Sequence, residues 1–225
     1  MKMEAVKVTD VEKSFTDGMG REKVLKNVTF SLEEGTFTAL TGISGAGKTT
    51  LLHLLAGFQK PDKGEILLAG RQIQKMKEKE AAPFRRRHIA MVFQEGALLP
   101  GLTVEENMIL PVVMDTGRLL DEEKLNQILE TLSLTGQRNR YPAELSGGER
   151  QRAVFGRALF SEAELILADE PAARLDTRQS LELMGTLKRC AKVWHRTILM
   201  ATHDLDLAQI CDETLELRDG CIWSK

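Results

Sequence analysis

The chain has 225 residues, of which 42% are hydrophobic and 28% charged, and its formal net charge is −2. Such a composition excludes a largely disordered chain, and the length is enough to bury a sizeable core. Lys and Arg number 31 against 33 Asp and Glu, so the sequence has no general positive charge of the kind that attracts phosphate backbones. We therefore expect no nucleic-acid partner.

The three cysteines, Cys190, Cys211 and Cys221, are odd in number and form no close C-x-x-C pair. This pattern predicts neither a disulfide framework nor a zinc site, and it favours a reducing compartment. Residues 1–15 lack the apolar stretch of a signal peptide, and no apolar run is long enough to span a bilayer. Because the sequence shows no repeat and no linker, we expect one domain over residues 1–225.

Segments with a preference for β-structure dominate the N-terminal part of the chain. Apolar and β-branched residues predict strands at residues 6–11, 24–32, 36–41, 64–68 and 89–93. Leucines at helical spacing predict a helix over residues 49–58, directly after a glycine-rich turn.

From residue 103 onward the pattern becomes helical. Capping signals predict helices that begin after Thr103, over residues 121–134, and from Ser146 to about residue 160. Alternation then resumes, with predicted strands at 165–168 and 197–201, helices at 177–192 and 204–210, and a hairpin over 214–223. This order predicts an α/β fold with a parallel sheet that is interrupted by a helical insertion.

Residues 42–49, with the sequence GISGAGKT, match the phosphate-binding pattern G-x-x-x-x-G-K-[ST] between a predicted strand and a predicted helix. Glycines let backbone N–H groups turn toward a phosphate, and the start of the helix adds its positive end. The alternative is an ordinary glycine turn before a helix. We expect Lys48 to reach the β- and γ-phosphates and the Thr49 hydroxyl to ligate Mg²⁺. The expected phosphate contacts are Gly42, Ser44, Gly45, Ala46, Gly47, Lys48, Thr49 and Thr50.

Two adjacent carboxylates, Asp169 and Glu170, end the apolar segment 165–168. Parallel strands deliver their C-terminal ends to the ligand-binding edge of an α/β sheet, where the phosphate loop also lies. We expect Asp169 to hold Mg²⁺ and Glu170 to orient or deprotonate the attacking water. His203 follows the strand at 197–201 and is expected to meet the γ-phosphate by the same logic. The alternatives are acidic turn residues and a capping histidine.

Residues 145–151, with the sequence LSGGERQ, form a second glycine-rich helix start with a free hydroxyl at Ser146. This is a second candidate anion site. One fold needs only one triphosphate cradle, so the second is either idle or serves a nucleotide held by another copy of the chain. The latter predicts a head-to-tail dimer with two ATP molecules at its interface.

With these motifs in this order over nearly its whole length, the chain resembles the nucleotide-binding subunit of an ABC transporter. The resemblance implies an α/β P-loop fold of the ABC ATPase type, with an antiparallel β subdomain and a helical insertion subdomain at about residues 95–160. It implies ATP and Mg²⁺ as ligands. It also implies an integral-membrane permease as partner, and a peripheral location on the cytoplasmic face of the cell (inner) membrane.

The resemblance further assigns roles to individual residues. Phe15 would stack on adenine, and Asp176 would be the D-loop aspartate. Gln94 would be the Q-loop glutamine in contact with Mg²⁺ or the attacking water, although a polar residue at a strand end is common by itself. His203 would be the switch histidine. The residues that would face the nucleotide of the partner subunit are Ser146, Gly148 and Gln151.

Segments 17–23, 85–89 and 97–107 are similar to the lipoprotein-release, macrolide-export and cell-division group of ABC ATPases. That group usually has PTGNLD after the catalytic glutamate, whereas residues 171–176 are PAARLD, so Arg174 places a charge at the expected dimer interface. The helix predicted from Ser146 to about residue 160 begins with the LSGGERQ segment, and we call it the signature helix. Gly156, inside this helix, is also unusual and is expected to lower helix stability slightly.

Several alternatives remain open from the sequence. The subunit could serve an importer, a cell-division type of mechanical signalling, or, without a permease, ribosomes or DNA. The apolar segment 108–114 could form a groove for a permease helix or pack internally. The basic run 85–87 could be a solvated face or contact lipid headgroups.

Overall fold

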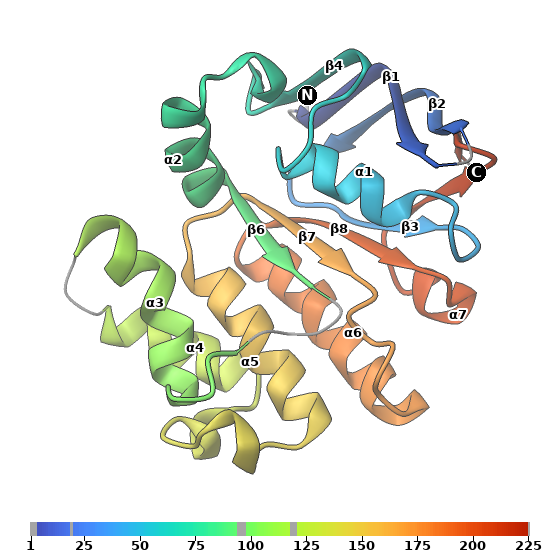
Figure 1. Ribbon diagram of the computed structural model, residues 1–225. Helices are drawn as coiled ribbons and strands as arrows, with labels where there is room; N and C mark the ends of the chain where they lie inside the picture. The colour runs from blue at the N-terminus through green and yellow to red at the C-terminus, as the bar shows by residue number, and fades with distance from the viewer. Residues whose placement is uncertain (1–3, 19, 94–97, 118–120, 225) are drawn as a thin grey trace.

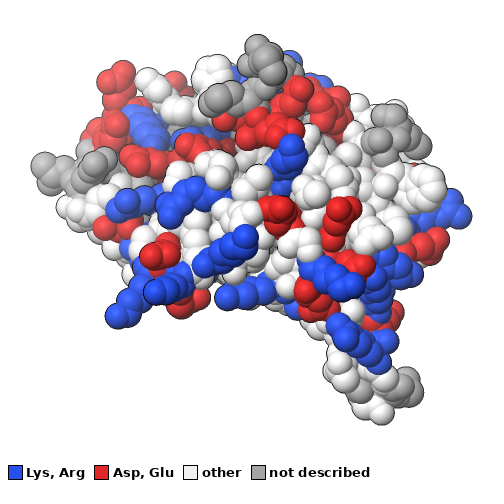
Figure 2. Space-filling model, turned by 90° about the horizontal axis from the view of Figure 1, so that it is seen from above, with Lys and Arg blue, Asp and Glu red and all other residues white. Residues whose placement is uncertain are grey.

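The computed structural model describes residues 4–18, 20–93, 98–117 and 121–224, and these form two sheets with helices packed around them (Figure 1). Gln94 lies outside the described residues. None of the helices in these ranges combines the length and apolarity that a bilayer span requires. On the face seen from above in Figure 1, basic and acidic side chains are interspersed (Figure 2).

The smaller sheet is antiparallel, as predicted, and its strand order is β2-β1-β4-β5. Its first two strands are longer than the sequence indicated. The strands are β1 (Glu4–Asp17), β2 (Gly20–Glu33), β4 (Lys63–Leu68) and β5 (Arg71–Gln72). In β1, Val6, Val8 and Val11 are fully buried and belong to a core cluster shared with helix α1 (Lys48–Leu55). Helix α1 lies between the two sheets (Figure 1).

The larger sheet has the order β10-β9-β3-β8-β7-β6, and its neighbours are parallel except for the β9–β10 hairpin. Its strands are β3 (Phe37–Thr41), β6 (Ile89–Val92), β7 (Leu165–Asp169), β8 (Thr197–Thr202), β9 (Glu213–Arg218) and β10 (Cys221–Ser224). Every residue of β3, β7 and β8 is buried. This explains their continuous apolar sequences, because central parallel strands are covered on both faces.

Alternation along β7 divides the molecule into two cores. Leu165 and Leu167 belong to the cluster on the α1 side of the sheet. Ile166 and Ala168 belong to the cluster on the other side, to which four helices contribute. These helices are α3 (Val104–Thr116), α4 (Glu122–Thr131), α5 (Gly147–Phe160) and α6 (Thr177–Val193). They agree with the predicted helices, and α7 (Leu205–Ala208) is shorter than predicted. Single 3-10 turns occur at η1 (Ile73–Lys75), η2 (Thr135–Gln137) and η3 (Pro142–Glu144).

Helix α2 (Glu78–His88) was not expected from the sequence, because it is rich in charged residues and Pro83 lies inside it. Of its residues, Ala81 and Phe84 are buried. It contains the basic run. Arg86 and Arg87 are partly exposed but lie 2.7 Å and 3.5 Å from the carboxylate of Asp115 in α3. The hydrogen bond from Arg86 is the main reason that the pKa of Asp115 lies below its ordinary value. The basic run therefore links α2 to the helical insertion.

The apolar segment of α3 packs internally for the most part. Met108 is fully buried, and Ile109 and Val112 pack against the larger core. Val113 and Met114 are exposed, at 46% and 73%. Internal packing is thus confirmed for part of this segment.

All three cysteines are free. Burial raises the pKa of Cys190 to about 11 and that of Cys211 to about 12. These two side chains are therefore protonated thiols at neutral pH.

Gly156 allows close contact between α5 and its neighbours. A Cβ atom at this position would lie 2.7 Å from Cε and 2.9 Å from Sδ of Met108, and 3.0 Å from Cδ1 of Leu132. Both neighbours are fully buried. The packing thus favours glycine, because a Cβ would displace these buried side chains, and this offsets its weak helix propensity.

We expect Gly156→Ala to lower the free energy of unfolding by about 1 kcal/mol, because overpacking of a buried site outweighs the gain in helix propensity. The matched control is Gly185→Ala in α6, where an added Cβ meets nothing within 4 Å. This control should raise the free energy of unfolding by about 0.5–1 kcal/mol. Urea unfolding followed by circular dichroism measures both. Equal stabilisation by the two substitutions would contradict the packing role of Gly156.

Helix α5 begins with a reciprocal capping box. The Ser146 hydroxyl accepts a hydrogen bond from the Glu149 N–H at 3.3 Å, and the Glu149 carboxylate accepts one from the Ser146 N–H at 2.8 Å. The latter bond is the main reason that the pKa of Glu149 lies below its ordinary value. The folded-state pKa is therefore lower than the unfolded one.

Glu149 consequently stabilises the fold above its unfolded pKa of about 4.3, and this contribution disappears as the pH falls through the folded-state pKa. Glu149→Gln retains an acceptor but cannot titrate. Between pH of about 5 and 3, the Tm of the wild type should therefore fall more steeply than that of the variant. Glu130→Gln, on the exposed face of α4, controls for the loss of one charge. Parallel Tm profiles for wild type and Glu149→Gln would refute this prediction.

Candidate active site

A pocket of about 960 Å³ opens at the C-terminal edge of β3, β7 and β8. It brings together most of the site residues that the sequence predicted. These are Phe15, Gly42, Ser44, Gly45, Gly47, Lys48, Thr49, Thr50, Asp169, Glu170 and His203. The pocket also has lining residues that no motif had indicated, namely Glu22, Val24, Thr41, Ile43, Ala173, Leu205, Thr214 and Glu216.

The glycine loop follows β3 and leads directly into α1. Gly47 has a positive φ of 102°, and a Cβ there would lie 2.8 Å from Cγ1 of Val24. A Cβ at Gly42 would lie 2.5 Å from the Leu217 carbonyl oxygen. Side chains are thus excluded at both positions by neighbouring strands. Ala46 lies outside the pocket lining, and its N–H donates to the Ile43 oxygen at 3.2 Å.

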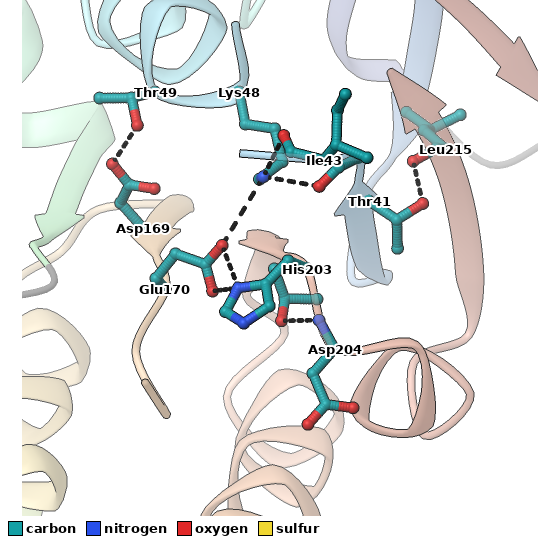
Figure 3. A network of polar contacts seen from close by, with 11 residues as sticks. Thr41, Ile43, Lys48, Thr49, Asp169, Glu170, His203, Asp204 and Leu215 are labelled. Atoms are coloured by element: carbon teal, nitrogen blue, oxygen red, sulfur yellow. Dashed lines mark hydrogen bonds and ion pairs between the residues drawn. The ribbon is translucent and has the colours of Figure 1, made fainter. Parts of the chain in front are cut away.

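Lys48 is the first residue of α1, and its side chain is only 7% exposed. The ammonium donates to the carbonyl oxygens of Gly42 at 2.8 Å and Ile43 at 3.2 Å (Figure 3). It also lies 3.7 Å from Oε1 of Glu170. The lysine thus bridges the phosphate loop and the carboxylate at the end of β7, where an incoming phosphate would compete for its donors.

Thr49 and Asp169 form the contact expected of a Mg²⁺ site. The Thr49 hydroxyl donates to Oδ2 of Asp169 at 2.8 Å (Figure 3). The other oxygen, Oδ1, is buried and has no hydrogen-bond partner among the described residues. A buried carboxylate oxygen without a partner is unusual and suits a cation. In the described ranges, no group of three or more His, Cys, Asp or Glu could hold a metal ion. The two oxygens of Thr49 and Asp169 nevertheless fit Mg²⁺, which typically uses one or two protein oxygens together with substrate phosphates.

Glu170 connects β7 to its neighbour and to His203. Its backbone has a positive φ of 46°, and its N–H donates to the Ala201 oxygen of β8 at 3.0 Å. Nδ1 of His203 lies 3.0 Å from both carboxylate oxygens of Glu170 (Figure 3). A left-handed conformation is uncommon at a non-glycine residue and costs conformational energy. The geometry holds the carboxylate between Lys48 and His203.

Phe15 also lines the pocket and is 40% exposed. The Lys13 ammonium lies 5.5 Å from the centre of its ring and donates to the Lys60 oxygen at 2.8 Å. The aromatic ring is therefore held in place at the rim, where a base can stack on it.

Four residues predicted to face the nucleotide of a partner subunit or to belong to the D-loop do not line this pocket. They are Ser146, Gly148, Gln151 and Asp176. Ser146 caps α5, and Asp176 caps α6 by accepting from the Gln179 N–H at 2.8 Å. Gly148 is nearly fully covered, since a Cβ there would lie 3.4 Å from Oε1 of Gln179. Gln151 is buried, and its Nε2 has no partner in the described residues. The start of α5 and the D-loop segment 173–176 therefore form a second surface, which adjoins the pocket at Ala173.

The chain is similar to known proteins both in sequence and in structure. Residues 25–173 match the family described as ABC transporter. The chain is 37% identical over 224 residues to the bacitracin export ATP-binding protein BceA of Halalkalibacterium halodurans, covering 99% of this chain and 88% of that protein. It is 35% identical to the lipoprotein-releasing system ATP-binding protein LolD of Cytophaga hutchinsonii, covering 97% and 99%.

Among solved structures, the chain is similar to the post-hydrolysis dimer of the ATP-binding cassette MJ0796 bound to ADP and Pi. The TM-score is 0.85 at 32% identity, over 96% of each chain. The family match extends over most of the chain and contains the phosphate loop, the signature and the two carboxylates. This protein therefore belongs to the ABC transporter family, as an ATP-binding subunit that hydrolyses ATP.

Proposed function

We propose that this subunit hydrolyses Mg-ATP as a head-to-tail dimer and drives export or transmembrane mechanical work by a separate permease, from the cytoplasmic face of the cell (inner) membrane. The observation that carries the proposal is the contact network of Lys48, Thr49, Asp169, Glu170 and His203 in one pocket. The relatives named for bacitracin export and lipoprotein release favour export over import.

In this proposal the phosphates of ATP enter the glycine loop, and the Lys48 ammonium exchanges a carbonyl partner for a phosphate oxygen. Thr49 and Asp169 hold Mg²⁺, which neutralises phosphate charge when bound. Glu170 orients the attacking water and accepts its proton. His203, through its hydrogen bond to the carboxylate, keeps Glu170 in position and contacts the γ-phosphate. Gln94, outside the described residues, completes the contact with Mg²⁺ or water.

The second surface supplies the other half of each nucleotide site. Ser146, Gly148 and Asp176 belong to α5 and α6 and do not reach the pocket of their own chain. A second copy, related by two-fold symmetry, would bring them to the nucleotide of its neighbour. The solved structures of MJ0796 are dimers, which supports this arrangement.

Glu170→Gln should lower ATP turnover by about 100-fold or more while nucleotide binding is retained, because the variant loses the base but leaves the phosphate loop intact. Phosphate release and nucleotide affinity are measured separately. The matched control is Glu164→Gln at the other end of β7, which should retain turnover. If Glu170→Gln hydrolyses ATP as fast as the parent, the assigned role is wrong.

Ser146→Asp separates the dimer interface from the fold. Aspartate caps a helix about as well as serine, so α5 should remain intact, but the added carboxylate would face the triphosphate held by the partner. In a Glu170→Gln background, ATP should therefore produce dimers in light scattering, and addition of Ser146→Asp should abolish them. Thr103→Asp places the same charge at the N-cap of α3 and should leave the dimer unchanged. An ATP-induced dimer with Ser146→Asp would contradict the head-to-tail arrangement.

The membrane partner is tested by affinity isolation of tagged Glu170→Gln protein, with ATP, from detergent-solubilised native membranes. Mass spectrometry should identify a polytopic permease, and the outer domain of that permease would distinguish export from mechanical signalling. Recovery of ribosomal or DNA-associated proteins without a permease would refute the proposal.

A further inference from the structure

The pocket wall carries two carboxylates, Glu22 and Glu216, that the proposed hydrolysis does not use. The other two acidic residues of the pocket are engaged, Asp169 with Thr49 and Glu170 with Lys48 and His203. Among the described residues, neither Glu22 nor Glu216 has a hydrogen bond or an ion pair for its carboxylate. Because ionised carboxylates only accept hydrogen bonds, both can receive donors from a ligand.

Strand pairing places Glu22 beside the aromatic ring at the rim. Glu22 in β2 is the direct partner of Phe15 in β1. Side chains of directly opposed residues in an antiparallel sheet lie on the same face, with Cβ atoms about 5 Å apart. Glu22 therefore lies next to the ring on which the base is proposed to stack.

Glu216 lies next to the phosphate loop. It is paired with Thr41, the residue before Gly42, across β9 and β3. The Thr41 hydroxyl also donates to the Leu215 oxygen at 3.3 Å (Figure 3). Leu215 and Leu217 point into the core, so alternation along β9 turns the intervening Glu216 toward the pocket that it lines.

The order of these groups matches the order of groups in a nucleotide. The phosphates belong to the glycine loop, the ribose follows them, and the base is at Phe15. The hydrogen-bond donors that ATP or ADP offers beyond its phosphates are the two ribose hydroxyls and the amino group of adenine. Glu216 is the carboxylate nearer the phosphate loop in the strand pairing, and Glu22 is the one nearer the base.

We propose that Glu216 accepts hydrogen bonds from the ribose hydroxyls and Glu22 from the amino group of the base. The pair would thereby select ribonucleotides with an amino-bearing purine. This inference rests on the proposed nucleotide site. A carboxylate that receives no donor would repel the nearby phosphates, and the partly buried Glu216 would also lose hydration beneath the ligand. Discrimination against analogues that lack these donors follows from these effects.

The test is calorimetric binding to the full chain, with ADP as the reference because it is not turned over. The two analogues are 2′,3′-dideoxy-ADP, which lacks both ribose hydroxyls, and purine riboside diphosphate, which lacks only the amino group. The wild type should bind ADP about ten-fold more tightly than either analogue, as expected for one hydrogen bond to a charged group.

Each variant should lose the preference for ADP over one analogue and keep the preference for ADP over the other. Glu216→Ala should bind ADP and the dideoxy analogue equally, and Glu22→Ala should bind ADP and the purine riboside analogue equally. Glu213→Ala, on the same strand but outside the pocket lining, should keep both ratios. Thermal unfolding verifies that the variants are folded.

Two results would overturn the inference. The wild type could bind all three ligands equally, or the alanine variants could bind all three more tightly by one common factor, as expected for carboxylates that only repel phosphate. Failure of the proposed nucleotide site would look different. In that case the wild type would bind neither ADP nor ATP in the presence of Mg²⁺, and Lys48→Ala would change nothing.

Discussion

In-register parallel pairing of β3, β8 and β7 is the constraint on which the rest of this structure depends. Thr41 pairs with Thr202, and Asp169 pairs with Ala201. The segments that follow these strands therefore leave the sheet at one edge, although they are far apart in the sequence. Because all three strands are buried on both faces, a one-residue slip in register would move each side chain into the opposite core, where it would not fit the close packing. The chemistry of the pocket is thus protected by the packing of the core beneath it.

The polar network at this edge resolves an electrostatic problem created by burial. A lysine with 7% of its side chain exposed requires partners, and Lys48 finds two loop carbonyls and Glu170. Glu170 in turn is shared with His203, whereas Asp169 keeps one buried oxygen without a partner in the described residues. A nucleotide with Mg²⁺ would supply what is lacking at both places: phosphate oxygens for the lysine and a cation for the carboxylate. Ligand binding would then complete the network and would leave the sheet unchanged.

The helical insertion is positioned by different means. Within it, the close contact between α3 and α5 depends on Gly156, and its link to α2 depends on Asp115 between two arginines. The signature surface at the start of α5 is stabilised by its own capping box and contacts the D-loop segment through Gly147 and Leu175. The two halves of the proposed composite site therefore lie on different elements of one chain, the pocket at the ends of β3, β7 and β8 and the second surface at the starts of α5 and α6.

Local chemistry explains how much could be predicted from the sequence. The phosphate loop, the capping boxes at Thr103 and Ser146, and the carboxylates after an apolar strand depend on residues within a few positions of one another, so their signals survive in the linear chain. The comparisons also bear out the family that these motifs indicated. Helix α2 was missed because so few of its residues are apolar that no helical periodicity is visible.

Other features depend on contacts between distant segments. Glu22 and Glu216 line the pocket only because β2 pairs with β1 and β9 pairs with β3. The need for glycine at position 156 arises from Met108 and Leu132, which belong to a different part of the helical insertion. Sequence patterns report local propensity and the burial of one face, and they carry no information on which remote strand or helix supplies that face. The sequence alone therefore determined the motifs, because each depends on neighbouring residues. Tertiary packing decided which residues line the pocket and which residues hold its helices in place, because these contacts join distant segments.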